Sequence, residues 1–131
     1  MSGVTEEGKV AFGEWVAKTR TSSKIKGLVA DWLKSTNPSE YVGDIVTQGQ
    51  FARWVTAQSG FRVSESALGR LERNANTSAP SVELLAALTR MQILQFPDGR
   101  YCTLDEAIEV LTGELDPFTG DRKTCSNGAT P

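Results

Sequence analysis

Glu65, Ser66 and Arg70 place a carboxylate, a hydroxyl and a guanidinium within six residues of one another. These groups can hydrogen bond to different base atoms on the major-groove edge of base pairs. A guanidinium donates two bonds to guanine O6 and N7, a hydroxyl serves either kind of base, and a carboxylate accepts from the cytosine amine. For Glu65 a second interpretation is equally open, a surface glutamate favoured by the dipole at a helix amino end.

A further set of side chains has the chemistry to bind phosphate, either as cations or as polar groups at helix starts, where free N–H groups favour anions. The set comprises Thr47, Gln48, Arg53, Arg62, Ser64 and Arg73. For Arg70 and Arg73 the alternative is a surface arginine paired with Glu72 or Glu83.

The local pattern predicts a short helix that begins at Ser64. The Ser64 hydroxyl can accept a bond from a free N–H of the first turn, and Val63 can pack on Leu68 as a hydrophobic staple. Ala67, Leu68 and Leu71 then point to one side. The side chains between them, Gly69 included, are left on an outward face that is small, polar and partly basic.

A second helix is predicted immediately before it. Thr47 and Gln50 have the spacing of a capping box, in which each side chain satisfies the other residue's free N–H. Phe51 and Trp54 then begin an apolar stripe, and Ser59-Gly60 is a plausible left-handed stop.

The run Leu71-Glu72-Arg73-Asn74, followed by Pro80-Ser81 and Leu84-Leu85, resembles the helix-turn-helix of the phage-repressor class of regulators, the lambda-repressor or Xre-like domains. The resemblance covers about residues 47–90. It departs at residues 60–63, where the chain is longer than the tight turn of that class.

The resemblance implies that the helix starting at Ser64 enters the major groove of double-stranded DNA. The base-reading places of the class fall on Glu65, Ser66 and Arg70, and its capping residue falls on Ser64. The amino end of the preceding helix, at Gln48, would abut the DNA backbone.

The rest of the chain also reads as helical. Further amphipathic helices are predicted over 5–20, from about 23 to Asn37-Pro38, over 80–91 and from the capping box at Thr103 to Gly113. We therefore predict an all-α fold, a compact bundle of about five helices that includes the helix-turn-helix.

For two segments the sequence predicts structure other than a regular helix. Around Pro97-Asp98-Gly99, residues 93–102 form either a small β-hairpin or a bent helix end. Residues 1–116 are expected to be a single domain, and residues 117–131 a disordered tail, because they lack apolar periodicity.

The charge distribution limits what kind of nucleic-acid binder this chain can be. The net charge is −2, but residues 1–73 carry ten basic against eight acidic residues, and the rest four against eight. Only a local surface in the first part can serve phosphates, without the overall basic footprint of a strong non-specific binder. The lysines at 24, 26 and 34 are read as a solvated helix face rather than as phosphate contacts.

Several chemistries are disfavoured by composition. Histidine is absent, which removes imidazole-based catalysis, and Cys102 and Cys125 lack the spacing of a zinc site. The acidic residues from Asp105 onwards are read as structural, because Asp105 and Glu106 fall in the first turn of a helix. We expect no enzyme activity, no cofactor and no bound metal.

Nothing in the sequence predicts a membrane partner, because no apolar run reaches the length of a span and the start of the chain is polar. The chain is expected to be cytoplasmic.

Two functions remain. The first is a sequence-specific DNA-binding transcriptional regulator of phage or bacterial type. We expect it to bind as a homodimer, because one short helix supplies few base contacts. The second is a helical protein–protein interaction module, an adaptor or inhibitor of a larger nucleic-acid machine, that binds through its acidic carboxyl-terminal part or the region of Trp15.

Overall fold

The computed structural model describes residues 3–73 and 80–122. Six helices follow one another in these residues: α1 (Glu6–Arg20), α2 (Ser23–Thr36), α3 (Gln48–Ser59), α4 (Glu65–Arg73), α5 (Val82–Arg90) and α6 (Leu104–Leu111). The predicted all-α fold is confirmed, with six helices in place of about five.

Side-chain hydroxyls fix where all six helices begin. In each of them a serine or threonine accepts a bond from a first-turn N–H, and α3 and α6 have complete capping boxes. The capping residues are Thr5, Ser22, Thr47, Ser64, Ser81 and Thr103.

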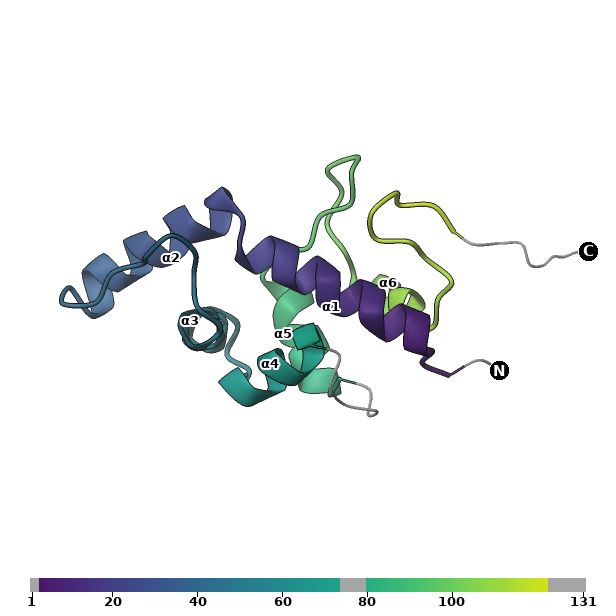
Figure 1. Ribbon diagram of the computed structural model, residues 1–131, viewed down its shortest axis with the longest axis horizontal. Helices are drawn as coiled ribbons and strands as arrows, with labels where there is room; N and C mark the ends of the chain where they lie inside the picture. The colour runs from purple at the N-terminus through teal and green to yellow at the C-terminus, as the bar shows by residue number, and fades with distance from the viewer. Residues whose placement is uncertain (1–2, 74–79, 123–131) are drawn as a thin grey trace, which may run out of the picture.

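Helix α1 lies at the centre of the bundle. Figure 1 shows it crossing the molecule, with α4 and α5 on one side, α6 near its amino end and α2 leading away to α3. Phe12 and Val16 are fully buried, and Trp15 packs against Phe96 with the ring centroids 5.1 Å apart. One hydrophobic core therefore joins the helices to the segment after α5.

Two glycines of α1 explain how closely its neighbours approach. A Cβ atom built on Gly8 would lie 2.0 Å from the carbonyl oxygen of Leu111, and one built on Gly13 would lie 2.3 Å from that of Leu71. The backbones of α6 and α4 therefore occupy the space that a side chain would need.

The segment after α5 turns back on itself as a small hairpin. Gln95 and Tyr101 form an isolated antiparallel bridge, and Gly99 takes a left-handed conformation with φ 89°. Cys102 N donates to Leu94 O at 2.8 Å. Of the two conformations that the sequence allowed here, the hairpin is the one present, although it contains no extended strand among the described residues.

The disordered tail was predicted to begin at a residue that lies too early in the sequence. Leu115 and Arg122 form a second antiparallel bridge, and Arg122 is paired with Glu109 at 2.7 Å. The Lys18 amine lies 5.3 Å from the centre of the Phe118 ring. The prediction of disorder is therefore wrong for residues 117–122, and the remainder of that prediction lies outside the described residues.

Among the described residues, no helix combines the length and the apolar character needed to cross a bilayer.

Cys102 is buried, and this burial, more than the neighbouring charges, raises the pKa of its thiol to about 12. The other cysteine, Cys125, lies outside the described residues.

Candidate nucleic-acid interface

The turn between α3 and α4 is built from residues 60–64. Gly60, with φ 82°, ends α3 in the left-handed conformation, and Val63 returns to the core. Thr56 Oγ1 accepts from Val63 N at 2.9 Å and donates to Val63 O at 3.1 Å. Ser64 Oγ then accepts from Ala67 N at 3.1 Å, as a cap for α4. This connection fixes the direction in which α4 leaves the turn.

One side of α4 is held against the rest of the domain. Leu68 is fully buried. Gly69 is buried as well, although the pattern placed it on the outward face. A Cβ atom on Gly69 would lie 3.2 Å from Gln48 Oε1 and 2.8 Å from Arg73 Nη1. The start of α3 therefore packs directly on α4.

A buried ion pair fixes the end of α4. Arg20 donates to both carboxylate oxygens of Glu72, at 2.9 and 2.8 Å, and also to Val46 O. Gln48 Nε2 donates to the same carboxylate at 3.0 Å. The side chains of Arg20 and Glu72 are only 11% and 6% exposed. The group therefore joins α1, α3, α4 and the segment before α3.

This network corrects one alternative drawn from the sequence. Glu72 is paired with Arg20 and not with Arg70 or Arg73. Sequence reasoning missed the pair because its two members are 52 residues apart. The one available signal was that Glu72 falls beside the inward positions of α4.

The side chains predicted to read bases lie on the open side of α4. Ser66 and Arg70 are exposed, as are the neighbouring Ser64 and Arg73. None of the four is covered by another described segment. Figure 1 shows α4 at the edge of the bundle.

Glu65 is exposed too, but its carboxylate is placed differently. A Cβ atom on Gly49 would lie 3.1 Å from Glu65 Oε1. The carboxylate therefore lies beside the first turn of α3, where the free N–H groups favour a negative charge. This position fits the dipole-favoured interpretation of Glu65 better than the base-reading one.

The predicted phosphate ligands divide into two groups. Arg62 and Arg73 are exposed, while Thr47 and Ser64 are exposed but already cap α3 and α4. Gln48 is the first residue of α3, and its side-chain amide donates to the Glu72 carboxylate. Most of the set therefore gathers around the start of α3 and the outer side of α4.

Arg53 is the member of that set with a strong internal partner. Its guanidinium donates to both carboxylate oxygens of Glu40, at 3.0 and 2.5 Å. This bonding, more than the additional amide donors, lowers the pKa of the Glu40 carboxyl to about 2. Arg53 would contact a phosphate only by sharing or leaving this ion pair.

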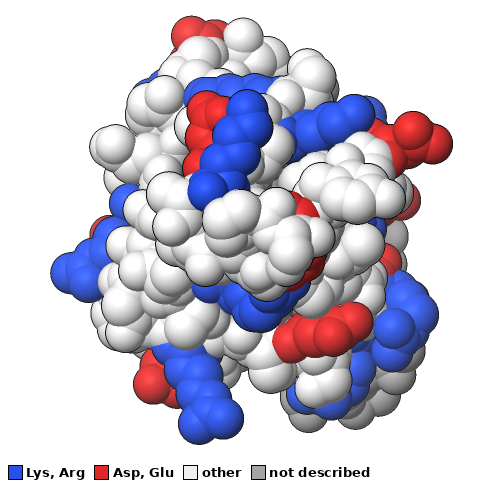
Figure 2. Space-filling view, turned by 90° about the vertical axis from the view of Figure 1, so that its left-hand side faces the viewer, with Lys and Arg blue, Asp and Glu red and all other residues white. Residues whose placement is uncertain are grey.

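Charges of both signs are mixed over this part of the molecule. Figure 2, which faces the left-hand side of Figure 1, shows basic side chains separated by acidic and uncharged ones. No continuous basic surface is visible in that view. Any phosphate binding here therefore depends on a few individual contacts.

Within residues 3–73 and 80–122, no three acidic or cysteine side chains are grouped so as to hold a metal ion. Glu106 completes the capping box of α6 and also pairs with Arg100, which agrees with the structural role predicted for the acidic residues there. Trp15 is 5% exposed, so its ring itself offers little surface to a protein partner.

Comparison with protein-family models, with curated proteins and with solved structures found no match.

Proposed function

We propose that this protein is a sequence-specific DNA-binding regulator that places α4 in the major groove. The observation that carries the proposal is the contrast between the two sides of α4. Its inner side is fixed by Leu68, Gly69 and the buried Arg20–Glu72 pair. Its outer side leaves Ser66 and Arg70 open to solvent. A rigid helix with free polar side chains has the form that direct readout requires.

The start of α3 supports the same assignment. Its first turn lies beside α4, through Gln48 at Gly69 and Glu65 at Gly49. Free N–H groups at a helix amino end favour a phosphate, and the Glu65 carboxylate beside Gly49 opposes one at the same place. One DNA strand can touch the start of α3, against this charge, while α4 lies in the adjacent groove.

Two single variants separate a residue that reads bases from one that contacts phosphate. Arg70→Ala is expected to weaken binding to the preferred duplex by about 1–3 kcal/mol and to leave binding to unrelated duplex nearly unchanged. Arg62→Ala is expected to weaken binding to both duplexes alike and to reduce the slope of log affinity against log salt by about one. Fluorescence anisotropy with both duplexes over a salt series measures these effects. Equal effects of the two variants on both duplexes would refute the assignment of Arg70.

The total salt dependence should be modest. Two to four phosphate contacts, from Arg62, Arg73 and the two helix starts, give a slope of roughly −2 to −4 for each chain.

Glu65→Gln distinguishes the two interpretations of Glu65. Because its carboxylate lies at the start of α3, where a phosphate would approach, we expect the variant to bind all duplexes more tightly, by up to about 1 kcal/mol. The same anisotropy series measures this change. Loss of preference at one cytosine position, with no general gain, would restore the base-reading role.

A protein–protein interaction module remains the second candidate, because apolar side chains are exposed on α5 and α6. Val82 is 70% exposed and Ile108 45%. If the full chain retains no duplex at low salt, this function replaces the first.

A further inference from the structure

Gln92 has a backbone conformation that its residue type disfavours. Its φ is 55°, and the other positive φ angles of the described residues belong to glycines. Glycine adopts this left-handed region without strain, because it has no Cβ atom. Gln92 directly follows Met91, the C-cap of α5, at a position where glycine is the usual residue. The Gln92 side chain therefore makes the fold less stable than glycine would, and its amide has no hydrogen-bond partner among the described residues.

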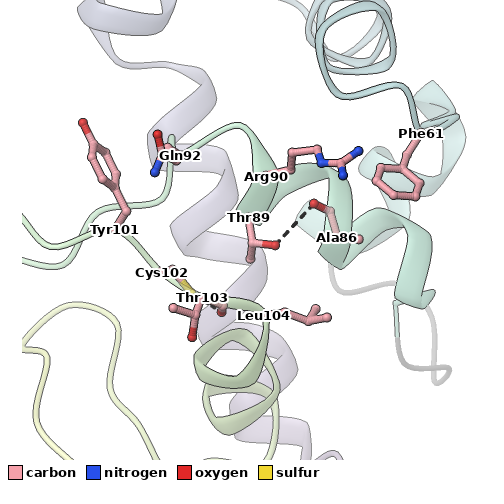
Figure 3. Close-up of a pocket in the computed structure, with 9 residues that line it drawn as sticks. All are labelled: Phe61, Ala86, Thr89, Arg90, Gln92, Tyr101, Cys102, Thr103 and Leu104. Carbon is pink, nitrogen blue, oxygen red and sulfur yellow. Dashed lines mark hydrogen bonds between the residues drawn. The ribbon is translucent and has the colours of Figure 1, made fainter.

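This side chain lines a hollow of about 400 Å³ that lies between α5, the hairpin after it and the start of α6. Figure 3 shows Arg90 extending toward Phe61 on one side of the hollow, with Gln92 and Tyr101 on the other side and Thr89 between them. The volume of the hollow is in the range of sites that bind small molecules. Because the hollow is open to solvent, we expect its ligands to bind weakly.

Arg90 is placed to bind an anion in this hollow. Its Nη1 donates to Ser59 O at 3.3 Å, and its guanidinium carbon lies 5.1 Å from the centre of the Phe61 ring. Its other N–H donors have no partner among the described residues, and no ion pair of these residues includes Arg90. Among the described residues that line the hollow, Arg90 is the only charged one. A guanidinium binds a carboxylate well, because its donors match the two carboxylate oxygens.

The rest of the lining suits a ligand with a single negative charge. Ala86 and Leu104 contribute apolar surface. Thr89 Oγ1 already donates to Leu85 O at 2.9 Å. A phosphate dianion or a second carboxylate would find no further cation among the described residues of the lining. The lining therefore favours a monocarboxylate with an apolar body.

We propose that this hollow binds a small organic monocarboxylate. The carboxylate pairs with Arg90, the apolar body packs against Phe61 and Leu104, and a hydrogen-bonding group at the far end meets the Gln92 amide. A hollow of this volume takes a ligand of about 10 to 15 non-hydrogen atoms. No described residue of α4 lines the hollow, so this binding site does not depend on the proposed function.

Nuclear magnetic resonance titration of the full, isotope-labelled chain tests the proposal. The probes are ε-acetamidocaproate and p-hydroxyphenylpropanoate, each with its uncharged carboxamide as the matched control. Both carboxylates should shift the backbone amide signals of residues 89–92 and 101–104 with a Kd on the order of 1 mM, and the carboxamides should bind at least about tenfold more weakly. If neither carboxylate shifts these signals at up to about 20 mM, or if the carboxamides bind equally well, the proposal is overturned.

Three variants separate ligand recognition from folding. Arg90→Gln keeps a donor for Ser59 O but removes the charge, and it should weaken carboxylate binding at least about tenfold. Lys34→Gln removes the same charge from an exposed position of α2 and should leave carboxylate binding unchanged. Gln92→Gly should weaken binding about three- to tenfold and yet raise the midpoint of thermal unfolding, because glycine relieves the backbone strain. Unchanged affinity in either Arg90→Gln or Gln92→Gly would overturn the proposal, as would an equal loss in Lys34→Gln.

Discussion

Glu72→Ala is expected to lower the free energy of unfolding by about 3–5 kcal/mol, the largest effect that we predict for a single substitution. The change would leave the buried Arg20 guanidinium with only Val46 O as a strong acceptor, and it would remove the partner of Gln48. An unpaired buried charge destabilises the folded state because the protein interior solvates it less well than water does. Urea unfolding followed by circular dichroism measures the loss.

The matched control is the other ion pair near α3. Glu40→Ala removes an equivalent bidentate partner from Arg53, whose side chain is 51% exposed. Water can then solvate the arginine, so we expect a far smaller shift of the unfolding midpoint. Replacing the whole buried pair, Arg20→Met with Glu72→Leu, should recover much of the lost stability. Equal midpoints for Glu72→Ala and Glu40→Ala would contradict this account of the buried pair.

Gly8→Ala is expected to destabilise the fold by about 2 kcal/mol or more, although alanine is the better helix former. The new Cβ atom would lie 2.0 Å from Leu111 O and 2.6 Å from Val110 O, both in the backbone of α6. These backbone atoms can move only if α6 shifts away from α1. That shift would also strain the hydrogen bond from Thr5 N to Leu111 O.

Gly27→Ala is the matched control for this change, because nothing lies within 4 Å of a Cβ at that position of α2. There the helix preference acts alone, and a gain of about 1 kcal/mol is expected. Thermal unfolding measures the change in stability of each variant, which we expect to be a loss for Gly8→Ala and a gain for Gly27→Ala. A stabilising Gly8→Ala would show that α1 and α6 are not packed as closely as described.

The helix pattern could be predicted from the sequence because its signals are local. The hydroxyls at Thr5, Thr47 and Ser64 lie within three residues of the N–H groups that they accept from. By local preference Gly8 and Gly13 are unfavourable in the first helix, since a glycine weakens a helix by about 1 kcal/mol. The structure explains them as close contacts with α6 and α4, which no local pattern can reveal.

The candidate site was predictable in part for the same reason. That Ser66 and Arg70 face outward follows from helix periodicity, and both are exposed. The partners of Arg20 and Arg53 depend on how distant segments pack, so the Glu72 and Glu40 pairs could not be inferred. The direction of Glu65 depends on the neighbouring helix and was left between two interpretations.

Selection from a pool of randomised DNA duplexes tests most directly whether the outer side of α4 reads sequence. The full chain should enrich a defined site, and Arg70→Ala, which leaves the buried side of α4 intact, should lose the enrichment at a guanine within it. If the wild type enriches no sequence, or if Arg70→Ala enriches the same site with unchanged preference, α4 is not the reading element.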